Sequence, residues 1–381
     1  MKRIVSFTLA LVFCLSLFAC TKADNAGNQN PDDPKPEPPA IIHKTYNLAS
    51  ERDVAKIKIN GRSKVGTGGI YCDSSVSGIE FNAYVEGELK LTLNVSQSTN
   101  LNEKIRNECY FTLYIDGVRW ETRLSALAGN NTLTLANFET GAMRNVKLVK
   151  QTGAHAALCT LKSLEFTGYF GEKPADKELL VEFIGDSITV GYGNLCTDHN
   201  DPNRGQAIMQ DGTKAFAYLT AEKLGADISS ICVSGMGIAK GHRQFLADEF
   251  FDATSYYRDP SEKYTATRKP DVIVINLGTN DQNKQADSNE LIKKVKELIT
   301  LVRQKYGKDT PIVWVHGMMG NGKWQEINSV LNKQFKGEAD KIYTLEISQN
   351  SDGGGGHPGL AAHESTSATL SAFIKTKVLG K

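Results

Sequence analysis

The stretch VEFIGDSITVGYGN, residues 181–194, determines how the C-terminal half of this 381-residue chain is interpreted. Its apolar run VEFI meets the tripeptide Gly-Asp-Ser, which ends at Ser187, and a second glycine-punctuated turn follows. Near-continuous apolar runs are typical of strands that are buried on both faces of a sheet. Because parallel sheets carry their sites at the carboxyl ends of strands, we expect Ser187 to lie in a functional site.

Four further apolar runs share this character, namely ISSICVSG, DVIVINLG, PIVWVHG and KIYTLEIS. Helical patterns separate them, and the longest, residues 288–307, places its apolar side chains on one stripe and ends at Gly307. Alternation of strands and helices predicts an α/β domain with a parallel sheet between two helical layers, a three-layer α/β/α arrangement, over residues 179–381.

Residues 41–170 follow a different pattern of short, alternating, turn-rich segments. The segment GIEFNAYVEGELKLTLNVS alternates with a period near two and is interrupted at Glu86-Gly87. In CYFTLYIDGVRWETRL, the pair Asp116-Gly117 predicts the turn of a hairpin. Several short strands with frequent turns predict a smaller β-sandwich domain, joined by residues 171–178 to the α/β domain.

The N-terminus predicts export. Residues 1–20, MKRIVSFTLALVFCLSLFAC, place two basic residues before an apolar run that is short for a membrane span. The end of this run resembles the lipobox of bacterial lipoproteins, so we expect acylation of Cys20 and an exported, membrane-anchored lipoprotein facing the periplasm or the cell surface. An ordinary signal peptide with an incidental cysteine is the alternative. The proline-rich residues 21–40 predict an extended tether, because they lack large apolar side chains.

The charge balance, the cysteine count and the absence of metal-binding motifs limit the kinds of partner and cofactor that we expect. The 44 Lys and Arg nearly cancel the 43 Asp and Glu, so no overall field favours nucleic acid as a partner. Beyond Cys14 and Cys20, five cysteines remain, and this odd number assigns no disulfide pairing. The sequence has no CxxC pair or HExxH motif that would indicate a metal site, and we expect no cofactor.

Four polar residues follow the ends of the predicted parallel strands: Ser187, Gly235, Asn280 and His357. A serine hydroxyl becomes a strong nucleophile when a histidine within hydrogen-bond reach takes its proton. Attack on an ester creates an oxyanion, which needs preorganised donors. The N–H groups of Ser187 and Gly235 and the side-chain amide of Asn280 are the expected donors. The pattern therefore predicts a serine esterase site.

The blocks GDSITVGYGN, VSGMGIA, INLGTND and HPG resemble, in order, those of SGNH (GDSL-type) hydrolases. The segments IKINGRSK, SGIEFNAYVEG, CYFTLYIDG and LKSLEFTGYF resemble the jelly-roll domain that precedes the SGNH domain in carbohydrate esterase family 2, and the likeness covers about residues 48–378. By position the resemblance implies that Ser187 is the nucleophile and His357 the base, and that Gly235 and Asn280 complete the oxyanion hole. It also implies deacetylation of plant polysaccharides without a metal or organic cofactor.

The sequence departs from the family pattern before His357. Family members commonly carry an aspartate three residues before the histidine, or two in some relatives, but Gly354 and Gly355 stand at these positions. Asp352 lies five residues before, across four glycines. Either Asp352 folds back onto the imidazole or a backbone carbonyl orients the ring. We favour a Ser–His dyad with a carbonyl partner and keep Asp352 as the alternative third member.

Other candidates have both a functional and a structural interpretation. Tyr192, beside the nucleophile, and Trp324, after a strand end, are candidates for stacking on a sugar ring, and packing is an equal alternative for Trp324. His316 closes the PIVWVH strand and is the second choice as base. His363 lies inside the last helical pattern, where we expect a surface residue.

The sequence therefore predicts a serine esterase that removes O-acetyl groups from acetylated xylan or glucomannan through an acetyl-enzyme. Its expected partners are an acetylated polysaccharide or oligosaccharide and a membrane reached only through the lipid anchor. An SGNH lipase or thioesterase acting on other acyl esters is one alternative. A catalytically inactive carbohydrate-binding lipoprotein is the other. The polysaccharide substrate follows from the family resemblance alone.

Overall fold

The computed structural model describes residues 39–96, 107–335 and 341–381. The predicted signal segment, Cys20 and most of the predicted tether lie outside these residues. Residues 40–381 form one compact unit of contacts. In the described part of the chain, no helix has the length and apolar character needed to cross a membrane.

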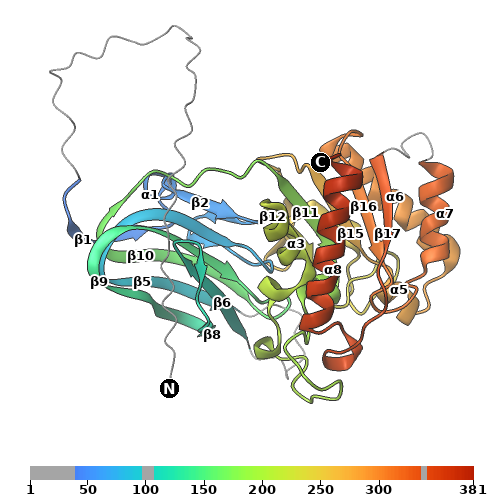
Figure 1. Cartoon of the computed structure of the whole chain (residues 1–381), viewed down its shortest axis with the longest axis horizontal. Coiled ribbons are helices and arrows are strands. Elements are labelled where there is room, and N and C mark those ends of the chain that lie inside the picture. Colours follow the sequence, from blue (N-terminus) through green and yellow to red (C-terminus); the bar gives the residue numbers. More distant parts are fainter. Residues whose placement is uncertain (1–38, 97–106, 336–340) are drawn as a thin grey trace, which may run out of the picture. The chain divides into compact units, whose positions relative to one another are not determined.

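The N-terminal part is an antiparallel sheet system (Figure 1). Its strand order is β3-β4-β10-β5-β9-β6-β7, while β1, β2 and β8 pair with β10, β5 and β6. The strands are β1 (Ile42–Asn47), β2 (Ile57–Asn60), β3 (Lys64–Gly66), β4 (Gly69–Tyr71), β5 (Gly78–Ser96), β6 (Glu108–Ile115), β7 (Val118–Arg119), β8 (Leu124–Leu127), β9 (Gly129–Lys150) and β10 (Leu158–Phe170). Their inward side chains, Phe81, Leu91 and Phe166 among them, form one buried core.

The structure shows the local conformation at two glycine positions of the predicted strands. The Asp116-Gly117 turn is confirmed, since both residues have positive φ angles between β6 and β7, as a tight hairpin requires. The interruption of the alternating pattern at Glu86-Gly87 falls inside one long strand and does not separate two strands. Gly87, with φ +74°, instead sits beside a β-bulge, and β5 continues for 19 residues along β9 and β10.

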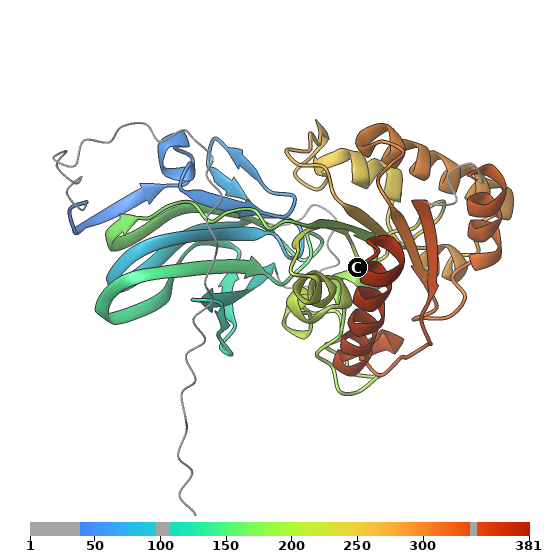
Figure 2. The same ribbon diagram turned by 45° about the horizontal axis from the view of Figure 1, so that its top comes forward.

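The C-terminal part contains a parallel sheet in the order β12-β11-β15-β16-β17, as the apolar runs predicted. These strands are β11 (Leu180–Gly185), β12 (Asp227–Cys232), β15 (Val272–Asn276), β16 (Ile312–His316) and β17 (Ile342–Glu346), and a small hairpin joins β13 (Ala253–Ser255) to β14 (Asp259–Lys263). Helices and strands alternate along the chain (Figures 1 and 2). The described helices are α1 (Glu51–Val54), α2 (Ser187–Val190), α3 (Phe216–Leu224), α4 (Ala247–Asp252), α5 (Thr279–Asn283), α6 (Ser288–Tyr306), α7 (Trp324–Gln334) and α8 (Leu360–Phe373).

Both faces of the parallel sheet are buried, because alternate side chains of each strand enter different cores. Val181 and Phe183 of β11 pack in a core shared with α3 and α8, whereas Ile184 packs in a core shared with α4, α6 and α7. This is the predicted α/β/α layering. It leaves the carboxyl ends of the strands as the edge from which polar loops emerge.

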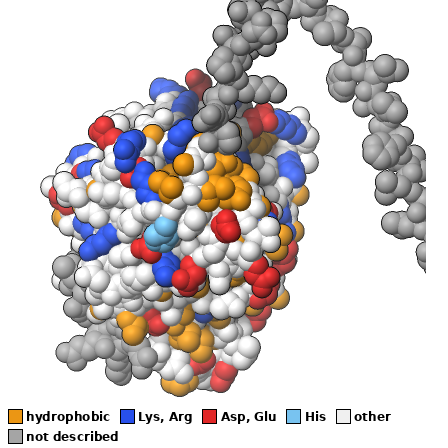
Figure 3. Space-filling model, turned by 90° about the vertical axis from the view of Figure 1, so that its left-hand side faces the viewer, with side chains coloured by type: hydrophobic (Ala, Val, Ile, Leu, Met, Phe, Trp, Pro, Cys, Tyr) orange, Lys and Arg blue, Asp and Glu red, His pale blue; other side chains and the backbone are white. Residues whose placement is uncertain are grey.

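Surface charge is mixed on the face that Figure 3 shows. Basic and acidic side chains are interspersed there around a group of hydrophobic side chains and a histidine. Among the described residues, Ile41, Ile42 and Met143 are exposed apolar side chains of the N-terminal part. Five cysteines, Cys72, Cys109, Cys159, Cys196 and Cys232, are buried free thiols.

Candidate active site

Ser187 and His357 lie in direct hydrogen-bond contact. Ser187 is the first residue of α2, immediately after β11, and Asp186 caps this short helix by accepting the N–H of Ile188 at 3.0 Å. His357 follows a 3₁₀ turn, Gly354–Gly356, after β17. The His357 Nε2 atom is 2.9 Å from the Ser187 Oγ atom. This is the distance that a general base needs to take the hydroxyl proton.

A backbone carbonyl orients the imidazole. The Nδ1 atom of His357 lies 3.2 Å from the carbonyl oxygen of Gly354, so a proton on Nδ1 leaves Nε2 free to accept from Ser187. The turn requires glycine at Gly355 and Gly356, whose φ angles are +65° and +76°. Burial lowers the pKa of His357 to about 4, although the nearby carbonyls act in the opposite direction, and the ring is therefore neutral at neutral pH.

Asp352 has a different contact in the structure. Its Oδ1 atom accepts the N–H of Gly359 at 2.6 Å, at the residue that caps the N-terminus of α8. The hydrogen bonds of the His357 ring go to Gly354 and Ser187 instead. Asp352 thus shapes the loop between the glycine turn and α8, and the arrangement around His357 corresponds to the dyad with a carbonyl partner.

The three predicted oxyanion donors follow the ends of neighbouring strands. Ser187 follows β11, Gly235 lies in the loop after β12, and Asn280 is in α5 after β15. Within the part of the chain that the structure describes, no acceptor is bonded to the N–H of Ser187 or of Gly235. The Nδ2 atom of Asn280 donates to the Asp186 Oδ2 atom and to the Met236 carbonyl, both at 2.9 Å. Donation to an oxyanion would therefore need a shared or exchanged Asn280 proton.

Two buried carboxyl groups support these donor loops. Burial raises the pKa of Asp186 to about 7, and the neighbouring charge of Asp281 acts in the same direction. Asp281 is fully buried and accepts the N–H groups of Ile238, Ala239 and Lys240 at 2.7–3.2 Å. It thereby holds the loop after β12, which carries Gly235, against α5. The interpretation of Asp186 and Asp281 as loop-holding residues agrees with these contacts.

Tyr192 contacts His357, whereas Trp324 contacts another histidine, His316. The Tyr192 ring lies 4.6 Å from the His357 ring, centroid to centroid, and covers one side of it. The Trp324 and His316 rings are stacked with their centroids 3.8 Å apart, so each ring covers one face of the other. The expectation of a surface position for His363 is wrong. The packing of α8 against α3 buries this ring fully, and its Nδ1 atom accepts the N–H of Phe216.

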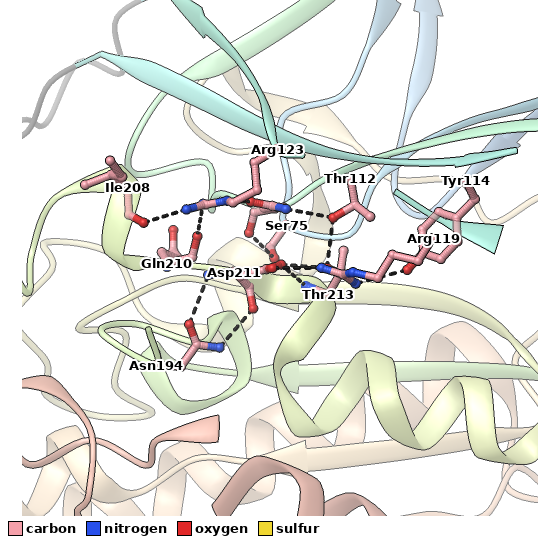
Figure 4. A network of polar contacts seen from close by, with 11 residues as sticks. Ser75, Thr112, Tyr114, Arg119, Arg123, Asn194, Ile208, Gln210, Asp211 and Thr213 are labelled. Atoms are coloured by element: carbon pink, nitrogen blue, oxygen red, sulfur yellow. Dashed lines mark hydrogen bonds and ion pairs between the residues drawn. The ribbon is translucent and has the colours of Figure 1, made fainter. Parts of the chain in front are cut away.

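A polar network that the sequence did not predict supports the His357 turn from the side of the antiparallel N-terminal strands (Figure 4). Arg119 donates to the Asp211 carboxylate at 3.0 Å, and Arg123 donates to the Gln210 carbonyl at 2.8 Å. The side-chain amide of Asn194 brackets Asp211, donating to its carbonyl and accepting its N–H.

The segment that contains Asn194 forms hydrogen bonds directly with the turn before His357. The carbonyl of Gly193, next to Asn194, accepts the N–H of Gly354 at 3.0 Å, and the carbonyl of His199 accepts the N–H of Gly355 at 2.8 Å. Residues 193–199 therefore hold the turn that carries His357. These contacts join residues that lie far apart in the sequence, so no local sequence pattern could have predicted them.

Metal chemistry has no evident ligand set here: the described residues contain no group of three or more His, Cys, Asp or Glu side chains arranged to hold a metal ion.

The sequence model of the GDSL-like Lipase/Acylhydrolase family matches residues 183–347, from β11 to the end of β17. This range includes Ser187, Gly235 and Asn280 and ends before His357. Residues 183–347 form a GDSL-like lipase/acylhydrolase domain.

Two curated relatives extend the comparison. The chain is 28% identical over 356 residues to the cellulase/esterase CelE of Acetivibrio thermocellus, covering 86% of this chain and 40% of the relative. It is 35% identical over 113 residues to an acetylxylan esterase / glucomannan deacetylase of Cellvibrio japonicus, covering 29% of this chain and 31% of the relative. The chain thus spans well under half the length of either relative.

Solved structures match both parts of the fold. A family two carbohydrate esterase from Clostridium thermocellum, in complex with cellohexaose, is 28% identical with a TM-score of 0.76, and the match covers 84% of this chain and 99% of that one. An acetyl xylan esterase, Est2A, from Butyrivibrio proteoclasticus has the same TM-score at 21% identity, covering 88% and 99%, and shares the fold. Both structures match the N-terminal strands and the parallel sheet of this chain, and the first is a family two carbohydrate esterase.

Proposed function

We propose that this protein is a carbohydrate esterase that removes O-acetyl groups from a plant-type polysaccharide, acetylated xylan or glucomannan. The observation that carries the proposal is the 2.9 Å contact between Ser187 Oγ and His357 Nε2 at the carboxyl edge of a parallel sheet. Matches to family 2 carbohydrate esterases support the sugar ester as substrate class.

The acylation step follows from the geometry of the pair. The Ser187 Oγ atom attacks the acetyl carbonyl carbon while its proton moves to His357 Nε2, and the carbonyl electron pair becomes an oxyanion. The N–H groups of Ser187 and Gly235 are the available donors for this charge. When the intermediate collapses, the bond between the carbonyl carbon and the sugar oxygen breaks, and His357 gives its proton to that oxygen, which leaves as the sugar hydroxyl.

Deacylation reverses the roles of the same atoms. His357 takes a proton from water, whose oxygen attacks the acetyl-serine carbon, and collapse releases acetate and the Ser187 hydroxyl. The resulting cycle needs no acid beyond His357. The Gly354 carbonyl holds the Nδ1 proton throughout, and its partial charge stabilises the imidazolium that forms in each half.

Tyr192 is proposed to line the acyl or sugar site because it covers the His357 ring. Trp324 is proposed only as an outer contact, since one face of its indole is already occupied by His316. Anchoring through acylated Cys20 and export as a lipoprotein are proposed from the N-terminal pattern alone. The division into domains at residues 41–170 and 179–381 is likewise a proposal.

The test compares acetate release by the wild-type protein and its Ser187→Ala variant from acetylated xylan, acetylated glucomannan and nitrophenyl esters of increasing chain length. We expect release only by the wild type, with a sharp fall beyond acetyl. A preference that rises with chain length would favour a lipase or thioesterase. Equal release by both proteins, or release by neither, would overturn the esterase proposal and favour a carbohydrate-binding lipoprotein.

A further inference from the structure

We propose that Arg243 is the positioning residue of the oxyanion hole, acting through the Ser234–Gly235 peptide. The inference rests on the proposed serine esterase function and concerns a residue outside the matched sequence blocks. The Nε atom of Arg243 donates to the carbonyl oxygen of Ser234 at 2.6 Å. The peptide that this contact holds is the one whose N–H belongs to Gly235.

The geometry of the peptide unit links the two groups. A trans peptide is planar, so its C=O and N–H point in opposite directions from the same rigid plate. The chain has no cis peptide bond among the described residues. Fixing the Ser234 carbonyl on one side with Arg243 therefore fixes the direction of the Gly235 N–H on the other. That N–H has no acceptor among the residues that the structure describes, so it is available to a ligand.

The same short segment also holds the next peptide. The N–H of His242 donates to the carbonyl of Gly235 at 2.7 Å, so residues 242 and 243 bracket Gly235 from both of its peptides. The contact is close: a Cβ atom on Gly235 would lie 2.9 Å from the His242 Cβ atom, and the φ angle of Gly235 is +86°. Glycine is thus required by the approach of this segment as well as by the left-handed backbone.

The charge of Arg243 adds to its positioning effect. A guanidinium that donates to an amide oxygen draws electrons through the peptide and makes its N–H a stronger donor. Arg243 is partly buried and forms no ion pair with a carboxylate among the described residues. Burial raises the pKa of Tyr192, the residue whose ring lies against His357, and the positive charge of Arg243 acts in the opposite direction.

The loss of Arg243 is expected to lower kcat by less than the loss of an oxyanion donor itself. Removing an oxyanion donor outright lowers kcat by roughly 10²–10³-fold. Losing Arg243 leaves the donor in place but frees its orientation, so we expect a decrease of roughly ten- to a hundredfold in kcat. Because the oxyanion forms only during the reaction, KM is expected to change little.

The test measures kcat and KM for nitrophenyl acetate and for acetylated glucomannan with wild type, Arg243→Gln, Arg243→Lys and Arg243→Ala. Arg52→Gln is the matched control, because Arg52 is a well-exposed arginine of α1. The proposal predicts that Arg243→Gln lowers kcat by the same factor for both substrates, that Arg243→Lys loses less, and that methylguanidinium restores part of kcat in Arg243→Ala but not in the control.

Each contrary outcome has a separate meaning. A raised KM for glucomannan alone, with normal kcat for nitrophenyl acetate, would overturn the proposal and make Arg243 a sugar contact. Unchanged kcat in Arg243→Gln would also overturn it while leaving the esterase function intact. An inactive wild type would instead overturn the proposed function. If Arg243→Gln fails to fold, Arg243→Lys and the rescue of Arg243→Ala by methylguanidinium decide the question.

Discussion

The partly buried ion pair between Arg119 and Asp211 allows a quantitative prediction about the contact between the antiparallel N-terminal part and the α/β part (Figure 4). The Arg119 Nη2 atom lies 3.0 Å from the Asp211 Oδ2 atom. The Asp211 side chain is 1% exposed and the Arg119 side chain 25% exposed. We predict that Arg119→Ala and Asp211→Ala each destabilise the fold, and that their effects are strongly coupled.

The coupling energy follows from burial. Breaking a fully buried pair costs about 3–5 kcal/mol, whereas exposed pairs contribute about 0.2–1 kcal/mol. Since Arg119 keeps a quarter of its side chain in water, we expect a coupling of about 2 kcal/mol. Asp211→Ala should be the more destabilising single change by about 1–2 kcal/mol, because Asp211 also accepts the N–H and the hydroxyl of Thr213.

The assay is a double-mutant cycle by urea unfolding, followed by tryptophan fluorescence and by loss of activity. The matched control cycle uses Arg144 and Asp116, whose N–O distance is also 3.0 Å but whose side chains are 32% and 41% exposed. We expect a control coupling below about 1 kcal/mol. Equal couplings in the two cycles, or a value near zero for Arg119 and Asp211, would refute the argument from burial.

Three further predictions concern the site itself. Because His357 must be neutral to act as base and burial lowers its pKa to about 4, kcat/KM for nitrophenyl acetate should be flat above that pH and fall below it; a limb near 6.5 would contradict this. Tyr192→Ala exposes the His357 ring, so the acid limb should move up toward 6.5, and an unmoved limb would mean that Tyr192 does not shield the ring. Asp352→Asn keeps an acceptor for the Gly359 N–H, so kcat should change less than roughly tenfold; the loss of roughly 10⁴-fold seen when a triad acid is replaced would restore Asp352 as the third member.

The fold was predictable for segments whose secondary structure follows from a local pattern, such as a continuous apolar run or the helical repeat of apolar side chains. The apolar runs of β11, β12, β15 and β16 are buried on both faces, and a run of that kind is interpretable without knowing its neighbours, whereas the edge strand β17 is only partly buried. The long amphipathic pattern also became one helix, α6, with Leu291, Val295 and Leu298 buried. The bulge at Gly87 escaped prediction, because a glycine in a strand pattern indicates a turn or a bulge equally well.

The sequence allowed the residues of the candidate site to be predicted, but not the contacts that hold those residues in place. The order of blocks along the chain indicated Ser187 and His357, and the structure brings them to 2.9 Å. The contacts that hold them, such as Arg119 with Asp211 and Asn194 with the Asp211 backbone, join residues far apart in sequence. Such pairings have no local signature. His363 illustrates the same limit, because only the packing of α8 against α3 buries it.

The most direct test of the central claim, that His357 activates Ser187 for acyl transfer, is detection of the acetyl-enzyme. The wild-type protein and the His357→Ala variant would be mixed with nitrophenyl acetate, quenched in acid within one turnover, digested and analysed by mass spectrometry. We predict one added acetyl group on the peptide that contains Ser187 in the wild type, and its absence in the variant. Acetylation at another residue, or equal labelling of Ser187 in both proteins, would contradict the account.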